Sequence, residues 1–318
     1  MIYSSPLELI GNTPLLKLTR LVPKLEVNVY VKLEIFNLTG SVKDRPALSM
    51  IEDAEAKRLI KPGLTTLIES TSGNLGISLA AICKYKGYKF ICVLDPKAEP
   101  SKIYNMKAYG AEIVMVNKPD KEGGYQKPRI AKVKELLQKI PNSFNLNQYS
   151  NPANPYAHIQ TTGPEIYKDL KGKVDILVGA ISTGGTLCGT AKFLKEKVQN
   201  ILVTGVEPNG SIIFGGKYKP YLQQGTGLSF TPKNYNPQVI NERIKVSDKQ
   251  AFLTARKLAL NEGILVGGSA GGVLFVTLQK AKLLKENQNI VAILPDNGNR
   301  YLETVYSDKW LNDNGIII

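Results

Sequence analysis

Short apolar runs rich in β-branched residues alternate with amphipathic, helix-type stretches along this chain. The runs are TTLIEST from residue 65, FICVLDP from 90, EIVMVN from 112, VDILVGAIS from 174, ILVTGVEP from 201 and IVAILPD from 290. Between them lie amphipathic stretches such as LGISLAAICKYKG and FLTARKLALNEG, and the second ends in a glycine where a helix C-cap belongs. Such an alternation predicts an α/β fold in which helices cover both faces of parallel sheets.

Two of the expected turns between a strand and a helix resemble each other, namely ESTSGNLGISLAA from Glu69 and GAISTGGTLCGTA from Gly179. Each follows an apolar strand, passes through Ser, Thr and Gly, and opens a helix. The chain of 318 residues is therefore expected to contain two similar α/β parts. The Asn- and Pro-rich stretch NQYSNPANP, which begins at Asn147, is the best candidate for a boundary. We expect a small domain at 39–149 and a large domain formed by 1–38 with 150–318.

The charge balance argues against nucleic acid as a partner. A net charge of +14 suits a phosphate-binding surface, but only seven of the 41 Lys and Arg residues are arginine, and the lysines form no long run. Guanidinium groups make most bidentate contacts to phosphates and bases, so their scarcity disfavours nucleic-acid binding. A lysine-rich surface that meets anionic small molecules is the preferred interpretation.

The cysteines, the single histidine and the apolar runs indicate the compartment of the protein and argue against a metal cluster. Cys83, Cys92 and Cys188 form neither a C-x-x-C pair nor an even disulfide framework, which is typical of a reducing compartment. The single histidine, His158, cannot form a metal cluster by itself and is expected on a helix surface or in a satisfied polar contact. No signal-peptide pattern or membrane-spanning apolar run is present, so a cytoplasmic location without a membrane partner is expected.

The motif STGGT, residues 182–186, places hydroxyl groups and unhindered backbone N–H groups at the start of the expected helix TLCGTAKFLKEK. A helix N-terminus combines unpaired donors with the positive end of the helix dipole, so it suits a phosphate. The motif is neither G-x-x-x-x-G-K-[ST] nor G-x-G-x-x-G, which argues against an NTPase and a dinucleotide enzyme. A tight glycine turn without a ligand remains open from this motif alone.

A second turn and a lysine complete a possible site. TSGN, residues 71–74, has a size that fits a carboxylate better than a polyphosphate. NLTGSVKDRP, from residue 37, places Lys43 between a glycine-containing turn and the expected start of a helix. A desolvated lysine loses its proton readily and attacks carbonyl carbon. A phosphate site, a carboxylate site and a reactive amine together indicate pyridoxal phosphate holding an amino acid. Lys32, in the strand-like VYVKLE, competes with Lys43 but is expected to be structural.

With these motifs in place, the chain resembles the fold-type II family of pyridoxal-phosphate enzymes that includes cysteine synthase and cystathionine β-synthase. The matching segments occur in family order: IGNTPLLKL, KLEIFNLTGSVKDRPA, ESTSGNLGI, NQYSNPAN, STGGTLCGT, GVEPNGS, EGILVGGSAGG and LPDNGNRYL. The resemblance implies two doubly wound three-layer α/β domains of the tryptophan synthase β-like type. It also implies a homodimer and closure of the small domain over an amino-acid substrate.

The resemblance also assigns roles to the cofactor-binding positions. Lys43 matches the lysine that binds the cofactor covalently and later moves the α-proton. Asn74 matches the residue that binds the phenolic oxygen, and Ser269 matches the serine that faces the pyridine nitrogen. The phosphate loop is matched by Ser182, Thr183, Gly184, Gly185 and Thr186, with Ser182 standing where many cysteine synthases have glycine.

The remaining matches concern the substrate and the reaction. The binders of the substrate carboxylate are matched by Thr71, Ser72 and Gln148. A serine beside the ring nitrogen can leave the ring neutral, which disfavours long-lived carbanions and favours prompt loss of a β-substituent. The expected reaction is therefore β-replacement on an O-activated L-serine through an aminoacrylate, with Lys43 serving twice because its amine remains beside Cα.

Several positions depart from an ordinary cysteine synthase. Leu75 replaces the threonine usual after TSGN, and GTGLSF from residue 225 replaces the usual G-I-G-[AY] segment, which puts sulfide specificity in doubt. The segments ESTSGNLGI, GGYQKPRIAKVKELL, SIIFGGKY and LPDNGNRYLETVYSDKWL are instead similar to synthases of the 2,3-diaminopropionate pathway. Arg129 could bind substrate phosphate or glutamate carboxylates, although a helix-surface role remains open. Tyr149 and Ser182 are expected to shape the substrate pocket.

Three enzymatic interpretations remain. The leading one joins O-phospho-L-serine to L-glutamate and forms N-(2-amino-2-carboxyethyl)-L-glutamate. The second is a cysteine synthase that uses O-acetylserine or O-phosphoserine with sulfide. The third is a cystathionine β-synthase or a cysteine lyase that releases hydrogen sulfide. A catalytically silent scaffold is disfavoured because Lys43, STGGT and Ser269 are intact.

Overall fold

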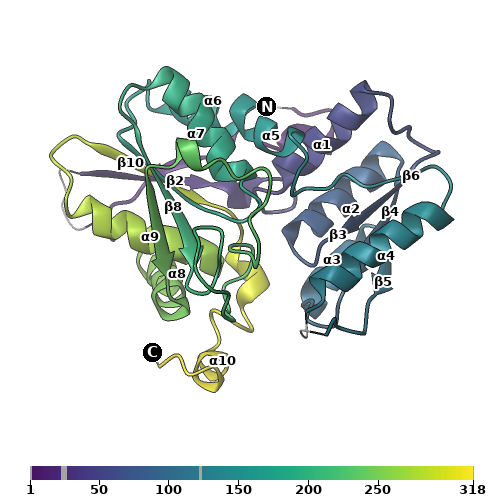
Figure 1. Ribbon diagram of the computed structural model, residues 1–318. Helices are drawn as coiled ribbons and strands as arrows, with labels where there is room; N and C mark the ends of the chain where they lie inside the picture. The colour runs from purple at the N-terminus through teal and green to yellow at the C-terminus, as the bar shows by residue number, and fades with distance from the viewer. Residues whose placement is uncertain (1, 23–26, 122–123, 318) are drawn as a thin grey trace. The chain divides into compact units, whose positions relative to one another are not determined.

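The computed structural model describes residues 2–22, 27–121 and 124–317 (Figure 1). The chain divides into two compact units. Unit 1 comprises residues 1–42 and 154–318, and unit 2 comprises residues 43–153. Each unit is built around a sheet of its own.

Unit 1 contains a sheet of six strands, in which only β1 runs antiparallel to its neighbour and the other pairs are parallel. In spatial order the strands are β1 (Leu15–Lys17), β2 (Asn28–Leu33), β10 (Asn289–Leu294), β7 (Ile176–Ala180), β8 (Leu202–Pro208) and β9 (Glu242–Val246). Because parallel strands end at one edge of a sheet, the turns that follow them are gathered at that edge.

Helices lie on both faces of this sheet (Figure 1). On strand β10, Ile290, Ala292 and Leu294 belong to one apolar core, whereas Val291 and Ile293 belong to another. The alternation follows the period of two that places successive side chains on opposite faces. The helices of this part are α5 (Ala153–Gln160), α6 (Thr162–Asp169), α7 (Gly185–Lys197), α8 (Asp248–Glu262), α9 (Gly268–Ala281) and α10 (Asp308–Asp313), with 3₁₀ turns η1 (Pro6–Leu9), η2 (Glu34–Phe36), η3 (Pro237–Val239) and η4 (Gly298–Tyr301).

Unit 2 contains a parallel sheet of four strands, in the order β5 (Glu112–Met115), β4 (Lys89–Leu94), β3 (Thr66–Ser70) and β6 (Ser143–Phe144). Its helices are α1 (Asp44–Ala56), α2 (Asn74–Lys86), α3 (Pro100–Ala108) and α4 (Gln126–Lys139). Helix α4 packs on one face through Val133, which shares a core with Ile68 and Val93. Every residue of β3 is buried, and α2 packs on β3 and β4 as well, so both faces of the sheet are covered.

The structure confirms the predicted α/β class with two doubly wound units. All six predicted apolar runs form strands, and the helix predicted to end in glycine ends at Gly263 in the left-handed conformation, as α2 also does at Gly87. Helix α8 begins in a capping box formed by Ser247 and Gln250. Strand β9 was not predicted, because most of its residues are exposed and give no apolar run.

The boundaries of the units differ from those expected from the sequence. Unit 2 spans 43–153, where 39–149 was expected. The reason lies in backbone pairing, since Val42 N donates to Pro295 O (2.8 Å) and Asn297 N donates to Gly40 O (3.1 Å), which joins this segment to the end of β10. The mobility of the small domain stays a prediction.

Helices α8 and α9 approach so closely that a side chain at Gly271 would not fit. A Cβ there would overlap the carbonyl oxygen of Ala251 and lie 2.9 Å from Ala255 Cβ. We expect Gly271→Ala to lower the thermal midpoint by about 4 to 8 °C through overpacking. The adjacent Gly272→Ala is the control, because its Cβ would lie 3.0 Å from Gln223 Oε1 and meet its next neighbours only at ordinary contact distances of 3.7 Å or more. Equal midpoints for the two variants in a thermal melt would contradict this packing.

Candidate active site

The predicted phosphate loop joins strand β7 to helix α7 in unit 1. Gly184 is the N-cap of α7 in the left-handed conformation (φ 89°), and no side chain caps the helix. The first turn of α7 therefore presents backbone N–H groups that the helix itself does not use. Thr183 lies beside them, where its Oγ1 accepts a hydrogen bond from Asn154 Nδ2 (3.2 Å).

Close packing explains the two adjacent glycines of this loop. A Cβ at Gly184 would lie 2.6 Å from the backbone nitrogen of Tyr235. A Cβ at Gly185 would overlap the amide oxygen of Asn154. The loop therefore accepts no side chain at either position, and Gly185 N donates to Thr183 Oγ1 (3.5 Å).

The single histidine lies behind the same loop. His158 is fully buried, so the expected surface position was wrong and the expected satisfied polar contact is what the structure shows. Its Nδ1 lies 2.9 Å from Thr162 Oγ1, and its Nε2 lies 3.3 Å from Thr186 Oγ1. If Nε2 carries the proton and donates to Thr186, the Thr186 hydroxyl can donate its own proton to an anion at the loop. Sequence reasoning gave no sign of this contact.

Ser269 is buried in the first turn of α9, also in unit 1. Gly267 is the N-cap of this helix, no side chain caps it, and Gly267 N donates to Asp296 O (3.2 Å). The side chain of Asp296 packs against Gly267 and accepts a hydrogen bond from the Tyr301 hydroxyl. The expected contact of Ser269 with a ring nitrogen stays a prediction.

The predicted carboxylate turn joins β3 to α2 in unit 2. Thr71 is buried, and its Oγ1 accepts a hydrogen bond from Gly73 N (3.4 Å). Gly73 is the N-cap of α2, and no side chain caps this helix either. Asn74 is the first residue of the helix. The turn thus offers hydroxyl and amide groups at a helix N-terminus, as expected for a carboxylate.

Arg129, in the first turn of α4, reaches this turn. Its Nη1 lies 3.0 Å from Asp95 Oδ2 and donates to Ser72 Oγ (3.3 Å). Its Nε is buried and has no hydrogen-bond partner among the described residues. Arg129 is therefore held inside unit 2, and the helix-surface alternative was wrong. Asp95 was missed by the sequence analysis, although it is the last residue but one of the predicted run FICVLDP.

Glu69 joins the carboxylate turn to the loop that carries Gln148 and Tyr149. Glu69 Oε2 accepts hydrogen bonds from Asn147 N (2.9 Å) and Asn145 Nδ2 (3.1 Å). Burial raises the pKa of Glu69 to about 7, even though its hydrogen bonds act in the opposite direction. Burial also raises the pKa of Tyr149. The one sequence signal for Glu69 is a carboxylate at the end of an apolar strand.

The two candidate lysines occupy different environments. Lys32 is fully buried in β2, where its Nζ pairs with Glu165 Oε2 (2.7 Å) and donates to Thr13 O (2.5 Å). These contacts indicate the structural role expected for Lys32. Lys43 is the N-cap of α1 and the first residue of unit 2, directly after Val42, which is fixed to Pro295 of unit 1.

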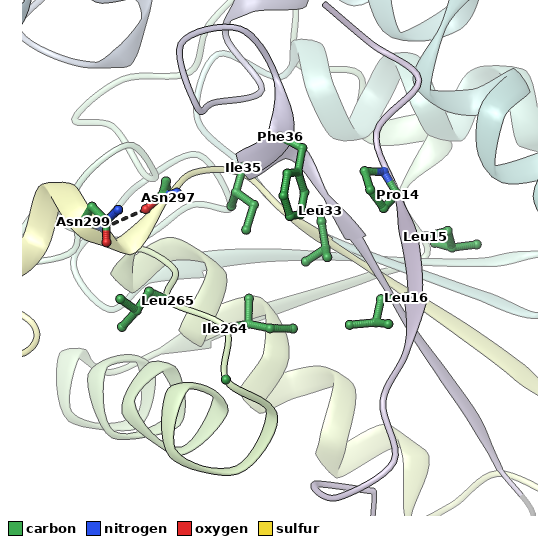
Figure 2. Close-up of a pocket in the computed structure, with 11 residues that line it drawn as sticks. Pro14, Leu15, Leu16, Leu33, Ile35, Phe36, Ile264, Leu265, Asn297 and Asn299 are labelled. Carbon is green, nitrogen blue, oxygen red and sulfur yellow. Dashed lines mark hydrogen bonds between the residues drawn. The ribbon is translucent and has the colours of Figure 1, made fainter. Parts of the chain in front are cut away.

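An apolar pocket of about 510 Å³ lies elsewhere in unit 1 (Figure 2). Leu33, Ile35 and Phe36 line it together with Ile264 and Leu265. None of the predicted site residues lines this pocket, and its few polar groups include no acid or base. Its size alone therefore does not make it the active site.

Comparisons with known proteins agree with these features. A family model of pyridoxal-phosphate dependent enzymes (PALP) matches residues 7–296. A crystal structure of a lysine-to-alanine variant of O-ureido-L-serine synthase with O-ureido-L-serine bound is 35% identical, covers 100% of both chains and has a TM-score of 0.89. A hydrogen sulfide-producing enzyme from Fusobacterium nucleatum is 38% identical, with 94% of this chain and 98% of that chain covered and a TM-score of 0.89. An O-acetylserine dependent cystathionine β-synthase from Helicobacter pylori is 37% identical, with 96% and 100% covered and a TM-score of 0.89.

The chain therefore belongs to the pyridoxal-phosphate dependent enzymes, and its cofactor is pyridoxal phosphate. Within them it is a synthase of the cysteine synthase family. The start of α7 fits the phosphate group of this cofactor, because the helix has no side-chain cap at its N-terminus and the hydroxyls of Thr183 and Thr186 lie in the same loop.

Two other classes of site find no support in the described part of the chain. No group of three or more His, Cys, Asp or Glu residues there could hold a metal ion. None of its helices has the length and apolar character needed to cross a membrane. The cytoplasmic location, the homodimer and the absence of a nucleic-acid partner stay predictions.

The contact between His158 and Thr186 predicts a specific effect on cofactor binding. We expect Thr186→Val to lower the affinity for pyridoxal phosphate about tenfold, because it removes a hydroxyl from the anion-binding turn. The affinity is measured by absorbance titration of the cofactor-free protein.

Thr190→Val is the matched control, since Thr190 lies one turn further along α7 and its buried hydroxyl has no hydrogen-bond partner among the described residues. This variant should bind the cofactor as the wild type does, with an equal or higher thermal midpoint. An equal loss of affinity in both variants would show that the Thr186 effect is general to the helix.

Proposed function

We propose that this enzyme catalyses β-replacement on an O-activated L-serine, and that its substrates are O-phospho-L-serine and L-glutamate. The product is then N-(2-amino-2-carboxyethyl)-L-glutamate, with phosphate as the leaving group. The bound cofactor supplies an aldehyde that takes up the amino group and a ring that withdraws electrons from Cα. The protein supplies binding, orientation and proton transfer.

The position of Arg129 carries the proposal for O-phosphoserine. Its guanidinium donates to Ser72, in the turn proposed to bind the substrate carboxylate. The Nε of the same guanidinium is buried and has no hydrogen-bond partner among the described residues, so it is a donor that the protein leaves unsatisfied. Asp95 Oδ2 lies 3.0 Å from the Nη1 of the same guanidinium and holds it in place. The hydrogen bond between Arg129 and Ser72 therefore joins two of the segments that resemble the diaminopropionate-pathway synthases, ESTSGNLGI and GGYQKPRIAKVKELL.

The remaining substrate contacts follow from the carboxylate turn. Thr71, Ser72 and Gln148 bind the α-carboxylate through hydroxyl and amide donors, and Tyr149 shapes the pocket beside them. Binding at the carboxylate fixes the orientation of Cα, so that its proton faces a single base. Lys43 provides that base, because a lysine released from the cofactor keeps its amine near Cα.

The proposed cofactor contacts follow from the resemblance to the family. Thr183, Gly184, Gly185 and Thr186, together with Ser182, bind the phosphate at the start of α7. Asn74 binds the phenolic oxygen, and Ser269 donates to or accepts from the ring nitrogen without charging it. A hydroxyl at this position leaves the ring a weaker electron sink than a carboxylate would, which favours loss of the β-substituent.

A second candidate is β-replacement on O-acetylserine with a thiol or sulfide. It is favoured by the 37% identity to an O-acetylserine dependent cystathionine β-synthase and the 38% identity to a hydrogen sulfide-producing enzyme. Release of hydrogen sulfide from cysteine belongs to the same group of reactions. These candidates differ from the first in the leaving group and the nucleophile.

The two candidates are separated by offering O-phosphoserine or O-acetylserine with glutamate, sulfide or homocysteine and identifying the product by mass. We expect the mass of the glutamate adduct with O-phosphoserine. Arg129→Met should lower kcat/KM for O-phosphoserine about tenfold or more relative to O-acetylserine, because only the phosphate carries two charges for the guanidinium.

Lys43→Ala is the control for the chemistry and should form no product from either serine derivative. If only O-acetylserine reacts and glutamate never adds, the second candidate replaces the first. If Arg129→Met affects both derivatives equally, Arg129 does not recognise the leaving group.

A further inference from the structure

The groups proposed to bind the substrate carboxylate come from two separate segments of unit 2. Thr71 and Ser72 follow strand β3, whereas Gln148 lies in the loop after strand β6. Strands β3 and β6 are neighbours in the sheet, with Thr66 opposite Ser143 and Leu67 opposite Phe144. The pairing between β3 and β6 ends at Leu67 and Phe144. Other contacts must therefore set the spacing between the two segments that follow these strands.

Glu69 makes that contact with one carboxylate. Its Oε2 accepts from Asn147 N (2.9 Å) and Asn145 Nδ2 (3.1 Å), and its Oε1 accepts from Ser70 N (3.2 Å). Asn145 Nδ2 also donates to Ile68 O (2.7 Å). The end of β3 and residues 145–147 are therefore fixed to each other by hydrogen bonds that converge on Glu69.

Asn147 determines the direction in which the next residue, Gln148, leaves the loop. It has a positive φ of 53°, and its carbonyl accepts from Ser150 N (3.1 Å) and Asn151 N (3.0 Å). Asparagine adopts this left-handed conformation more readily than other non-glycine residues, and contacts with the surroundings hold it there. The hydrogen bond from Asn147 N to Glu69 is one of the contacts that do so.

The surroundings of Glu69 exclude an ordinary ion pair. Glu69 is 4% exposed, and no Lys or Arg side chain pairs with it among the described residues. Strand β4 presents Cys92 opposite it, the 145–149 loop contributes Tyr149, and Arg129 of α4 is paired with Asp95. Hydrogen-bond donors alone compensate this buried carboxylate, which is a costly arrangement for a purely structural contact.

We propose that Glu69 is a positioning residue that sets the spacing between the Thr71–Ser72 hydroxyls and the Gln148 amide. It thereby determines how tightly the α-carboxylate of the amino-acid substrate is bound. This inference rests on the proposed role of these three residues, and it does not depend on the leaving group or the nucleophile.

The test compares Glu69→Ala with Glu69→Gln in the cofactor-loaded enzyme. Alanine leaves Asn147 N and the Asn145 amide without their acceptor, whereas the glutamine oxygen can still accept from both. We expect Glu69→Ala to raise KM for the serine derivative about tenfold with kcat within about threefold, and Glu69→Gln to keep KM within about threefold of the wild type. The dissociation constant of L-serine, followed by the cofactor's absorbance, should change in parallel.

Glu55→Ala is the matched control. Glu55 accepts hydrogen bonds from Lys86 Nζ and Tyr88 OH, both at 2.8 Å, at the opposite end of α2 from the carboxylate turn. This variant should lose stability without a change in KM or L-serine binding. If Glu69→Ala does not fold, Asn145→Ala serves instead, because it removes one of the hydrogen bonds on Glu69 and should raise KM about threefold.

Unchanged L-serine binding in Glu69→Ala, or an equal rise of KM in Glu55→Ala, would overturn the inference. An equal loss in Glu69→Gln and Glu69→Ala would also overturn it, because the charge and not the hydrogen bonds would then be decisive. A wild type that uses O-acetylserine in place of O-phosphoserine would change the proposed function but not this inference, since both substrates carry the same α-carboxylate.

Discussion

The uncapped start of helix α7 is the constraint on which the interpretation of this protein depends. Gly184 takes a left-handed conformation and Gly185 lies against Asn154, so the first turn of the helix has backbone donors and no room for a side chain. His158 approaches the same turn through Thr186. A parallel sheet delivers this turn to the carboxyl edge of unit 1, which is where α/β proteins bind ligands. The matching family model identifies the cofactor as pyridoxal phosphate.

Lys32 and Lys43 differ in their surroundings, and we expect a structural role for the first and a catalytic role for the second. Lys32 is buried against Glu165 and Thr13 O, so replacing it would leave a partly buried carboxylate without this cation. Lys43 lies at the start of α1, directly after a segment that is fixed to the end of β10. Such an anchor suits the two roles proposed for Lys43, because the same amine must hold the cofactor and later take the α-proton of the substrate.

Much of this architecture could be predicted from local sequence. The six apolar runs form strands, and the glycine after α8 marks the end of that helix, because period and capping are local properties. The contacts of Glu69 with Asn147, of Asp95 with Arg129 and of His158 with Thr186 could not be predicted, because each joins residues that only the fold brings together. Arg129 was singled out as a candidate, but its pairing with Asp95 and Ser72 depends on the packing of α4 against β3 and β4.

The central claim is that Lys43 is the residue that binds pyridoxal phosphate covalently. The most direct measurement is reduction of the cofactor-loaded enzyme with borohydride, which makes the link permanent, followed by proteolysis and mass mapping of the modified peptide. We predict a single pyridoxyl-phosphate modification on Lys43 and none on Lys32. A modification on any other lysine, or a modified Lys43→Ala variant, would contradict this assignment.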